Sequence, residues 1–309
     1  MARKGKRNRA EVREFEAAYP ASLEAVGSRL REGSGPVGDF REFWIKDPKE
    51  RCISAPCFAD RVLHHAVVGV CEEDFERWLV GQTFACRKDL GMRAAIAEAR
   101  RWSSTRRWYL QLDVRHYFES VPRQRMLEKL DRLFGEVRLL LLWQEILWSH
   151  RPGHDRGMPI GALTSQYLAN YYLGFLDRFI KERLRIRGYT RYMDDFVLWH
   201  DDKEALRDAR DAVRGFVEDG LGLVLKEPVL NRTIGGMDFL GFRFHPGWVG
   251  LSRRSRARLK QRIRSYETAW AEARMTDGEL QQRATAALAF VEPALTGRML
   301  VSGWAGDGP

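Results

Sequence analysis

The sequence lacks any long apolar run. No stretch of its 309 residues approaches the roughly 20 apolar residues that a membrane-spanning helix needs. The first residues, Met1 to Arg7, are too polar for the apolar segment of a secretory signal. We therefore expect a cytoplasmic protein with no membrane partner, and the hydrophobic content of 44% is ordinary for a folded chain.

Cysteine is also scarce, and its placement argues against cysteine-based sites. The four cysteines all lie in the first third of the chain, at Cys52, Cys57, Cys71 and Cys86. Their spacings match neither a zinc motif nor a redox motif. We expect buried free thiols in a reducing compartment.

The chain does contain a pair of adjacent carboxylates in an apolar setting. Asp194 and Asp195 separate the strand-like run Gly188 to Tyr192 from a second apolar run, Phe196 to Trp199. Two short β-prone runs joined by a tight turn predict a hairpin with both carboxylates at its turn. Like charges held side by side are costly unless a cation neutralises them, so the pattern favours a metal site. The alternative is a solvated Asp-Asp turn.

A third carboxylate, Asp113, lies near the end of another β-prone run, Trp108 to Val114. Phosphoryl transfer with two metal ions needs carboxylates from separate strands that converge on ions roughly 3.5–4 Å apart. Asp113, Asp194 and Asp195 meet this need if their strands are neighbours in one antiparallel sheet. Mg²⁺ keeps much of its shell for water and substrate phosphates, so three carboxylates suffice. We predict a site for two Mg²⁺ ions, with Mn²⁺ as a substitute.

Four segments carry a resemblance to a known family. They are Leu112 to Phe118, Gly157 to Gln166, Tyr192 to Asp195 and Phe239 to Phe242. In order and spacing these segments resemble the palm blocks of reverse transcriptases. The resemblance covers the chain from about Phe43 to Arg264. Within that family the chain most resembles the reverse transcriptases of diversity-generating retroelements. The features that carry this finer resemblance are the Ile-Gly-x-x-Thr-Ser-Gln pattern of Ile160 to Gln166 and the Met193 inside the Asp-Asp block.

The resemblance implies an α+β fold, the right-hand polymerase fold with fingers, palm and a short helical thumb. We expect an antiparallel palm sheet with helices on one face. The implied division is fingers over 1–105, a fingers insertion over 121–156, palm over 106–120 and 157–246, and thumb over 247–309. Local patterns predict helices over Asp60 to Val70, Gly91 to Trp102 and Asp202 to Glu218, a long helix from Gly161, a loop over Arg151 to Gly157 and a strand over Leu221 to Leu225.

The resemblance also implies an activity. It is an RNA-directed DNA polymerase that makes error-prone cDNA from a template-repeat RNA. The expected partners are the RNA template, a DNA or RNA primer, dNTPs and a small basic accessory protein oligomer. Two alternatives stay open: a defence-associated bacterial reverse transcriptase, and a non-catalytic RNA-binding scaffold. Because only about 65 residues follow Phe242, we expect no RNase H domain and dependence on host nucleases.

By resemblance, several residues would contact the incoming nucleotide. Phe118 matches the aromatic that excludes ribonucleotides, and Ile160 stands where accurate relatives place a glutamine. Arg51 and Arg61 would face the triphosphate, since arginine forks suit its oxygens. The remaining members of this predicted group are Gly161, Gln166, Tyr192 and Met193. The alternatives are ordinary ones: a core aromatic for Phe118, surface salt bridges for the arginines and helix capping for Gln166.

Further predictions concern proton transfer and the primer. Lys226 follows a predicted strand and is a candidate general acid for the leaving pyrophosphate, with an exposed lysine as the alternative. Phe239, Leu240 and Gly241 would form a hairpin that grips the primer end. The run from Arg253 to Arg264 holds seven positive charges in twelve residues of a chain whose net charge is +10. We predict a helix that follows a nucleic-acid backbone through Arg254, Arg258 and Arg262; the alternative is a solvated helix face.

Overall fold

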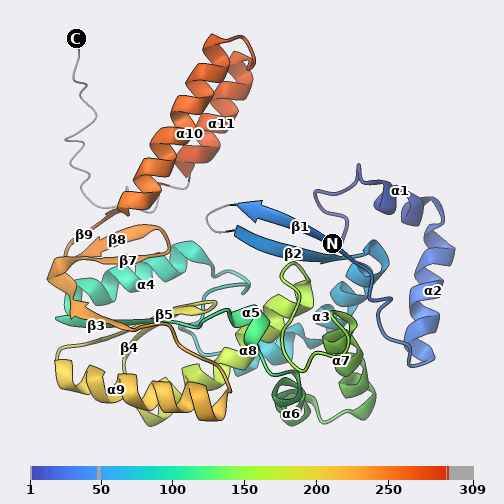
Figure 1. Cartoon of the computed structure of the whole chain (residues 1–309), viewed down its shortest axis with the longest axis horizontal. Helices are drawn as coiled ribbons and strands as arrows, with labels where there is room; N and C mark the ends of the chain where they lie inside the picture. Colours follow the sequence, from blue (N-terminus) through green and yellow to red (C-terminus); the bar gives the residue numbers. More distant parts are fainter. Residues whose placement is uncertain (1, 47–49, 290, 292–309) are drawn as a thin grey trace.

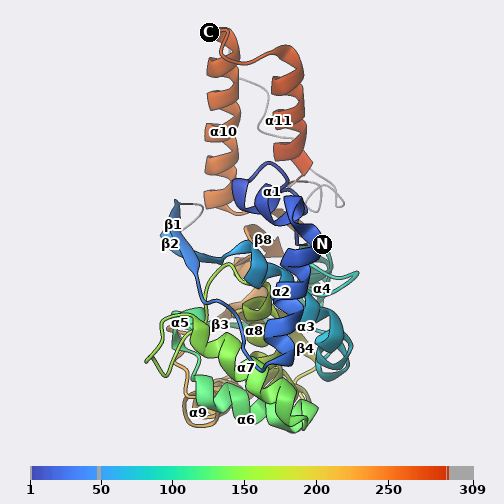
Figure 2. The ribbon, with the colours of Figure 1, turned by 90° about the vertical axis from the view of Figure 1, so that its right-hand side faces the viewer.

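The computed structural model describes residues 2–46, 50–289 and 291. Figure 1 shows a sheet-containing body flanked by helices, from which a hairpin of two long helices projects. The turned view of Figure 2 shows the same helical hairpin standing clear of the body. In the described residues no helix is both long enough and apolar enough to cross a bilayer.

The central sheet is antiparallel, as predicted. Its strands are β3 (Trp108–Asp113), β4 (Gly188–Tyr192), β5 (Asp195–His200) and β6 (Val229–Arg232), in the order β4-β5-β3-β6. β4 and β5 form the predicted hairpin, in which Tyr192 pairs with Asp195 around a two-residue turn. β3 lies beside β5, so that Asp113 and Asp195 are partners in the ladder.

Both faces of this sheet are covered, which makes the prediction of helices on one face wrong. One face packs against α8 (Leu163–Arg178) and α9 (Lys203–Gly215) through Leu110, Leu112, Phe196 and Leu198. The alternate residues Tyr109, Val197 and Trp199 pack against α4 (Met92–Thr105) and a second sheet. Because neighbouring strand residues point to opposite faces, a run that is apolar at nearly every position is buried on both sides.

The second sheet is a meander of β7 (Met237–Phe239), β8 (Phe242–His245) and β9 (Trp248–Leu251). Leu240 and Gly241 form the turn between β7 and β8, which confirms the predicted hairpin. Both turn residues have positive φ, 51° and 84°. This conformation suits a two-residue turn because its twist matches that of the flanking strands.

The predicted strand over Leu221 to Leu225 is wrong. Only Leu225 pairs, in an isolated bridge with Val114, and the fourth strand of the sheet begins at Val229. Leu221 and Leu223 are buried, so their alternation imitates a strand while the segment crosses the core as irregular chain. Gly222, at φ +63°, turns the backbone out of the extended conformation between them.

The other predicted helices are present, with bounds that differ from the predicted ones by one to eight residues. They are α3 (Phe58–Trp78), α4, α8 and α9. Two of them continue into π-helices: α8 into η1 (Phe179–Arg183), and α9 into η2 (Phe216–Gly220). Arg151 to Gly157 contains no helix or named strand, as predicted. The remaining elements of the body are α1 (Ala10–Ala17), α2 (Tyr19–Arg31), β1 (Phe40–Lys46), β2 (Glu50–Pro56), α5 (Tyr117–Ser120), α6 (Arg123–Phe134), α7 (Val137–Ser149) and the 3-10 turn η3 (Thr233–Gly235).

The projecting hairpin consists of α10 (Arg253–Ala271) and α11 (Asp277–Ala289), and α10 confirms the predicted basic helix (Figure 1). All four cysteines are free, but only Cys71 is fully buried, so the expectation of buried thiols holds for one of them. The last predicted thumb residues, 292–309, lie outside the described part of the chain.

Candidate active-site cleft

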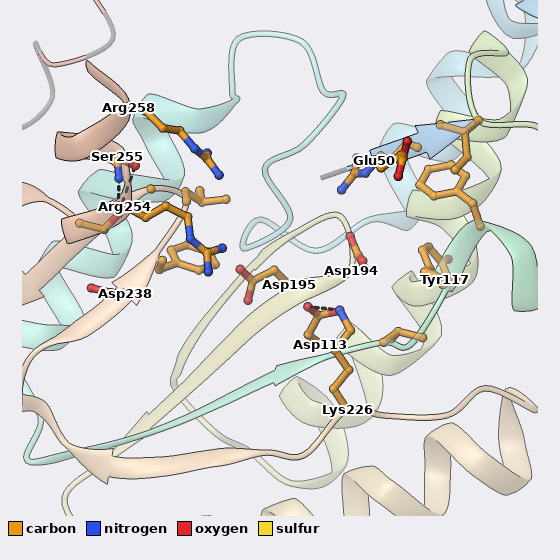
Figure 3. Close-up of a pocket in the computed structure, with 18 of the residues that line it drawn as sticks. Glu50, Asp113, Tyr117, Asp194, Asp195, Lys226, Asp238, Arg254, Ser255 and Arg258 are labelled. Carbon is orange, nitrogen blue, oxygen red and sulfur yellow. Dashed lines mark hydrogen bonds and ion pairs between the residues drawn. The ribbon is translucent and has the colours of Figure 1, made fainter. Parts of the chain in front are cut away.

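A cleft of about 1480 Å³ lies between the central sheet, the β1–β2 hairpin and α10. Its walls come from segments far apart in the sequence. They include Arg51 and Cys52 of β2, Asp113 of β3, the Asp194-Asp195 turn, the Leu240-Gly241 turn, and Arg254 and Arg258 of α10. Figure 3 shows the two α10 arginines on one side of the cleft and Glu50 on the other, with the carboxylates on the floor between them.

The three predicted carboxylates all line this floor. Asp113 ends β3, Asp195 begins β5, and Asp194 occupies the turn before it (Figure 3). The antiparallel ladder places Asp113 opposite Asp195, as required for carboxylates from neighbouring strands. Met193, the first turn residue, adopts φ +55°, which is uncommon for a residue with a side chain.

The neighbouring residues compensate these carboxylates only in part. Burial raises the pKa of Asp195 to about 7, with a hydrogen bond from Gln111 acting in the opposite direction. Burial, and next the charge of Asp113, raise the pKa of Asp194. Asp113 Oδ1 is buried without a hydrogen-bond partner. Carboxylate oxygens are the ligand type that a hard cation such as Mg²⁺ prefers, and the unpartnered oxygen of Asp113 is of this type.

The carboxylates do not form a closed cage. Within the described ranges, no three His, Cys, Asp or Glu side chains are gathered into a group that could hold a metal ion. Lys226 Nζ lies 2.6 Å from the second oxygen of Asp113 (Figure 3). The Lys226 backbone N–H also donates to the Asp113 carbonyl, at 2.8 Å. The ammonium is thus an ion-pair partner of a predicted metal ligand, which neither the general-acid prediction nor the exposed-lysine alternative anticipated.

Three of the predicted nucleotide-binding residues line the cleft: Arg51, Phe118 and Ile160. Trp44, a β1 residue that the sequence analysis missed, lines it as well and is 67% exposed. Trp44 lies in a strand whose residues are nearly all exposed, including its neighbours Phe43 and Ile45. The run of three large apolar residues in the sequence was the available signal, but it does not by itself distinguish an exposed strand from a buried one.

Four predicted nucleotide-binding residues lie outside the cleft lining: Gly161, Gln166, Tyr192 and Met193. Gly161 adopts φ +126°, and a Cβ there would come within 2.9 Å of Ile53 Cγ2. The absence of a side chain at position 161 therefore allows Ile53 of β2 to pack closely against this backbone. Gln166 accepts a 3.6 Å contact from Cys86 Sγ, and Tyr192 packs beside the core cluster of α4 and β7–β9.

Arg61 points away from the cleft. It is 8% exposed, its Nε donates to the Pro56 carbonyl at 2.8 Å, and its Nη2 lies 3.3 Å from Glu11. The prediction that Arg61 faces the triphosphate is not supported, because the rotation of α3 directs this side chain toward α1.

All six predicted primer and template contacts line the cleft: Phe239, Leu240, Gly241, Arg254, Arg258 and Arg262. Phe239 is only 1% exposed, so its ring belongs to the core. Arg254 and Arg258 extend from α10 toward the carboxylate floor in Figure 3. A basic helix that overhangs three acids is suited to a polyanion that bridges them.

A buried ion pair that was not predicted from the sequence lies beneath the Asp194-Asp195 turn. Arg191 and Asp177 both have fully buried side chains, with Arg191 Nη2 2.6 Å and Nε 2.7 Å from the carboxylate oxygens. Burial by itself lowers the pKa of Arg191, but Asp177 more than offsets this, and the pKa is raised. Arg191 Nη1 donates to the Met193 carbonyl at 3.0 Å, next to Asp194.

This ion pair is fully satisfied. Arg191 also donates to the side-chain and backbone oxygens of Asn170, so each of its five N–H groups has an acceptor. Asp177 accepts from two further buried groups, the hydroxyls of Tyr189 and Thr83, each at 2.6 Å. An arginine inside an apolar strand run was the available sequence signal, since a buried charge requires a partner.

A model of the family described as reverse transcriptase (RNA-dependent DNA polymerase) matches residues 45–244, more than half of the chain. The chain therefore belongs to the reverse transcriptase family, and its enzyme class is RNA-directed DNA polymerase.

Three known proteins are similar to this chain in sequence. Protein YkfC of Escherichia coli is 26% identical, over 74% of this chain and 72% of its own length. The group II intron-encoded protein LtrA of Lactococcus lactis is 22% identical, over 51% of this chain. A putative COX1/OXI3 intron 1 protein of Saccharomyces cerevisiae is 19% identical, over 53% of this chain. The matches cover only 28% of LtrA and 21% of the yeast protein.

Solved structures share the fold. Apo telomerase of Candida tropicalis, truncated from its C-terminal domain, has a TM-score of 0.55 at 11% identity, over 74% of this chain and 59% of that chain. Another apo telomerase structure from this organism has a TM-score of 0.52 at 10% identity, over 91% and 63% of the two chains. At such low identity the likeness shows the fold alone, and it confirms the predicted right-hand polymerase fold.

Proposed function

We propose that this chain copies RNA into DNA by two-metal phosphoryl transfer at Asp113, Asp194 and Asp195, in a diversity-generating retroelement. The observation that carries the chemistry is the meeting of the three acids on the floor of a cleft overhung by basic α10. A scaffold without activity has no use for desolvated carboxylates beside a nucleic-acid groove, since their burial is costly. The predicted division into fingers, palm and thumb belongs to the same proposal.

In this reaction the 3′-hydroxyl of the primer attacks the α-phosphorus of a dNTP, and pyrophosphate leaves. Bound Mg²⁺ ions would be held by the three carboxylates and would stabilise the charge that develops on the phosphoryl oxygens. Arg51 faces the same cleft and would neutralise the triphosphate. Lys226 would donate a proton to the leaving pyrophosphate once its ion pair with Asp113 has opened.

The retroelement assignment rests on the pattern from Ile160 to Gln166 together with Met193, and Ile160 is the residue that links it to error-prone copying. This residue lines the cleft, where an aliphatic side chain offers no hydrogen bond to a nascent base pair. Loss of polar readout supports error-prone copying, since discrimination by shape alone is weak. This assignment implies three partners: an RNA template, a DNA or RNA primer, and a small basic accessory protein oligomer.

Primer extension on an RNA template, with dNTPs and Mg²⁺, tests both the polymerase activity and the error-prone copying that the retroelement assignment implies. The wild-type protein should extend the primer, and sequencing of its cDNA should show frequent errors opposite adenine. Ile160→Gln should reduce these errors about severalfold, because one hydrogen bond contributes roughly 0.5–1.5 kcal/mol. Accurate copying of adenine by the wild type would favour a defence-associated reverse transcriptase, while no extension at all would contradict the polymerase proposal itself.

A further inference from the structure

One side chain connects the carboxylate floor to the strand that precedes the Leu240-Gly241 turn. Gln111 lies on β3, two residues before Asp113. Its Nε2 is 3.1 Å from Asp195 Oδ1 and 3.1 Å from the Asp238 carbonyl oxygen. Asp238 belongs to β7, which is part of the other sheet.

The register of the central sheet explains how Gln111 reaches both partners. Gln111 is paired with Val197, and Asp113 is paired with Asp195, so Gln111 and Asp195 are diagonal neighbours on one face of the sheet. β7 packs against this same face. A shorter side chain at position 111 would not span from one partner to the other.

The chemistry of the amide fits this position. Both partners are acceptors, and a glutamine amide has two N–H donors on its nitrogen and none on its oxygen. The orientation with Nε2 toward the two oxygens is therefore the one that avoids repulsion. A carboxylate at position 111 would repel both partners, and an apolar residue would leave both without this donor.

We propose that Gln111 is a positioning residue that orients the Asp195 carboxylate and ties it to β7, so that primer binding at the Leu240-Gly241 turn is linked to metal binding at Asp195. The proposal rests on the polymerase function and on the roles given above to Asp195 and to the turn. Primer binding that orders β7 would hold the Asp238 carbonyl, and through Gln111 the carboxylate, in place. By thermodynamic linkage, a metal ion at Asp195 would in turn favour primer binding.

Tyr109 provides a matched control for the contact between β3 and the β7 region. Tyr109 lies two residues earlier on the same strand and face, and its hydroxyl donates to the Gly236 carbonyl of the same region at 3.4 Å. Tyr109→Phe removes one hydrogen bond between β3 and Gly236, the residue before β7, without touching Asp195. Gln111→Met removes both hydrogen bonds of the amide with little change in side-chain length, and Gln111→Asn keeps the amide but shortens it.

The experiment measures metal binding apart from catalysis. Mn²⁺ binding to the full-length protein is titrated by electron paramagnetic resonance without nucleotide or nucleic acid. Gln111→Met and Gln111→Asn should bind Mn²⁺ about tenfold more weakly than the wild type, a typical cost of losing a partner that orients a metal ligand. Tyr109→Phe should bind like the wild type. Thermal unfolding of each variant confirms that it is folded.

A second measurement addresses the link to the primer. The affinity for one RNA–DNA primer–template is determined with and without Mn²⁺ for each protein. Wild type and Tyr109→Phe should gain affinity from the ion, and the two Gln111 variants should gain less. The half-saturating Mg²⁺ concentration for single-nucleotide addition should rise in the Gln111 variants about in proportion to their loss of Mn²⁺ affinity.

Three outcomes would overturn the proposal: unchanged Mn²⁺ affinity in both Gln111 variants, an equal loss in Tyr109→Phe, or an unchanged gain of primer affinity from the ion. These failures differ from a failure of the polymerase function. If the wild-type protein does not extend a primer, the polymerase function is contradicted. If it extends the primer and the Gln111 variants bind Mn²⁺ and primer–template as the wild type does, only the role of Gln111 is contradicted.

Discussion

Beneath the Asp194 turn, the side chains of Arg191 and Asp177 are fully buried, and every N–H of the guanidinium has an acceptor. On the other side of the cleft, none of the residues of α10 is buried. The buried pair supports the Asp194-Asp195 turn from below, whereas α10 lines the cleft itself, and the proposed function makes different demands on the two regions. Metal ligands must be held in one geometry, which a buried and satisfied network provides. A helix that contacts phosphates needs charge and freedom to adapt, and burial would remove both.

This contrast predicts that changes in the floor affect the rate of catalysis or the stability of the fold, and that changes in α10 affect binding. Four variants test it, from the largest expected effect to the smallest.

Asp113→Asn should reduce DNA synthesis by about a hundredfold or more, because a group that stabilises developing charge is lost. Primer–template affinity should stay near that of the wild type. Single-turnover extension and a binding titration measure the two quantities. Asp208→Asn, an exposed residue of α9, is the control for the amide substitution itself. Extension by Asp113→Asn at the wild-type rate would exclude the metal-ligand assignment.

Arg191→Met should lower the free energy of unfolding by about 3–5 kcal/mol, because Asp177 would be left buried without its cation. Any folded fraction should also be slow in synthesis, since the Met193 carbonyl loses its donor. Chemical denaturation gives the free energy, with the exposed Arg187→Met as the control. If both variants unfold at the same denaturant concentration, the network does not support the turn.

Phe118→Ala should admit ribonucleotides, because the ring would no longer fill the space of a 2′-hydroxyl. The ratio of ATP to dATP incorporation should rise by roughly tenfold to a hundredfold, the range for a changed apolar contact in a pocket. Incorporation of dATP by the same variant is the internal control. An unchanged ratio would mean that Phe118 is a core aromatic and that the gate lies elsewhere.

The triple change of Arg254, Arg258 and Arg262 to Gln should weaken nucleic-acid binding by about tenfold and flatten its log–log salt slope by about 2 to 3. The rate at saturating primer–template should change little. A matched triple change of Arg256, Lys260 and Arg264 removes the same charge from the same helix, but these residues do not line the cleft. Equal effects of the two triples would show that only the net charge of the helix matters.

Local patterns were sufficient to predict much of the sheet and the site. The strands around Asp113 and the Asp194-Asp195 turn were predictable because β-prone runs and a tight turn are determined within a few residues. The basic helix after Ser252 was predictable for the same reason. The direction of the buried Arg61 side chain was not predictable, since it depends on how α3 is rotated against α1. The segment Leu221 to Leu225 was wrongly predicted as a strand, because buried irregular chain can show the same alternation of apolar residues.

The sequence by itself determined which residue types were available: three acids in β-prone settings, a basic helix, and an aliphatic residue at position 160. These choices follow from local propensity and charge, which need no partner. Only the tertiary structure decided which groups meet. The pairs Lys226–Asp113, Arg191–Asp177 and Gln111–Asp195 join residues that are far apart in the chain or lie on different elements. Such contacts exist only after the sheet register and the packing of α8 beneath it are set, because hydrogen bonds and ion pairs act over a few ångströms of space and not along the chain.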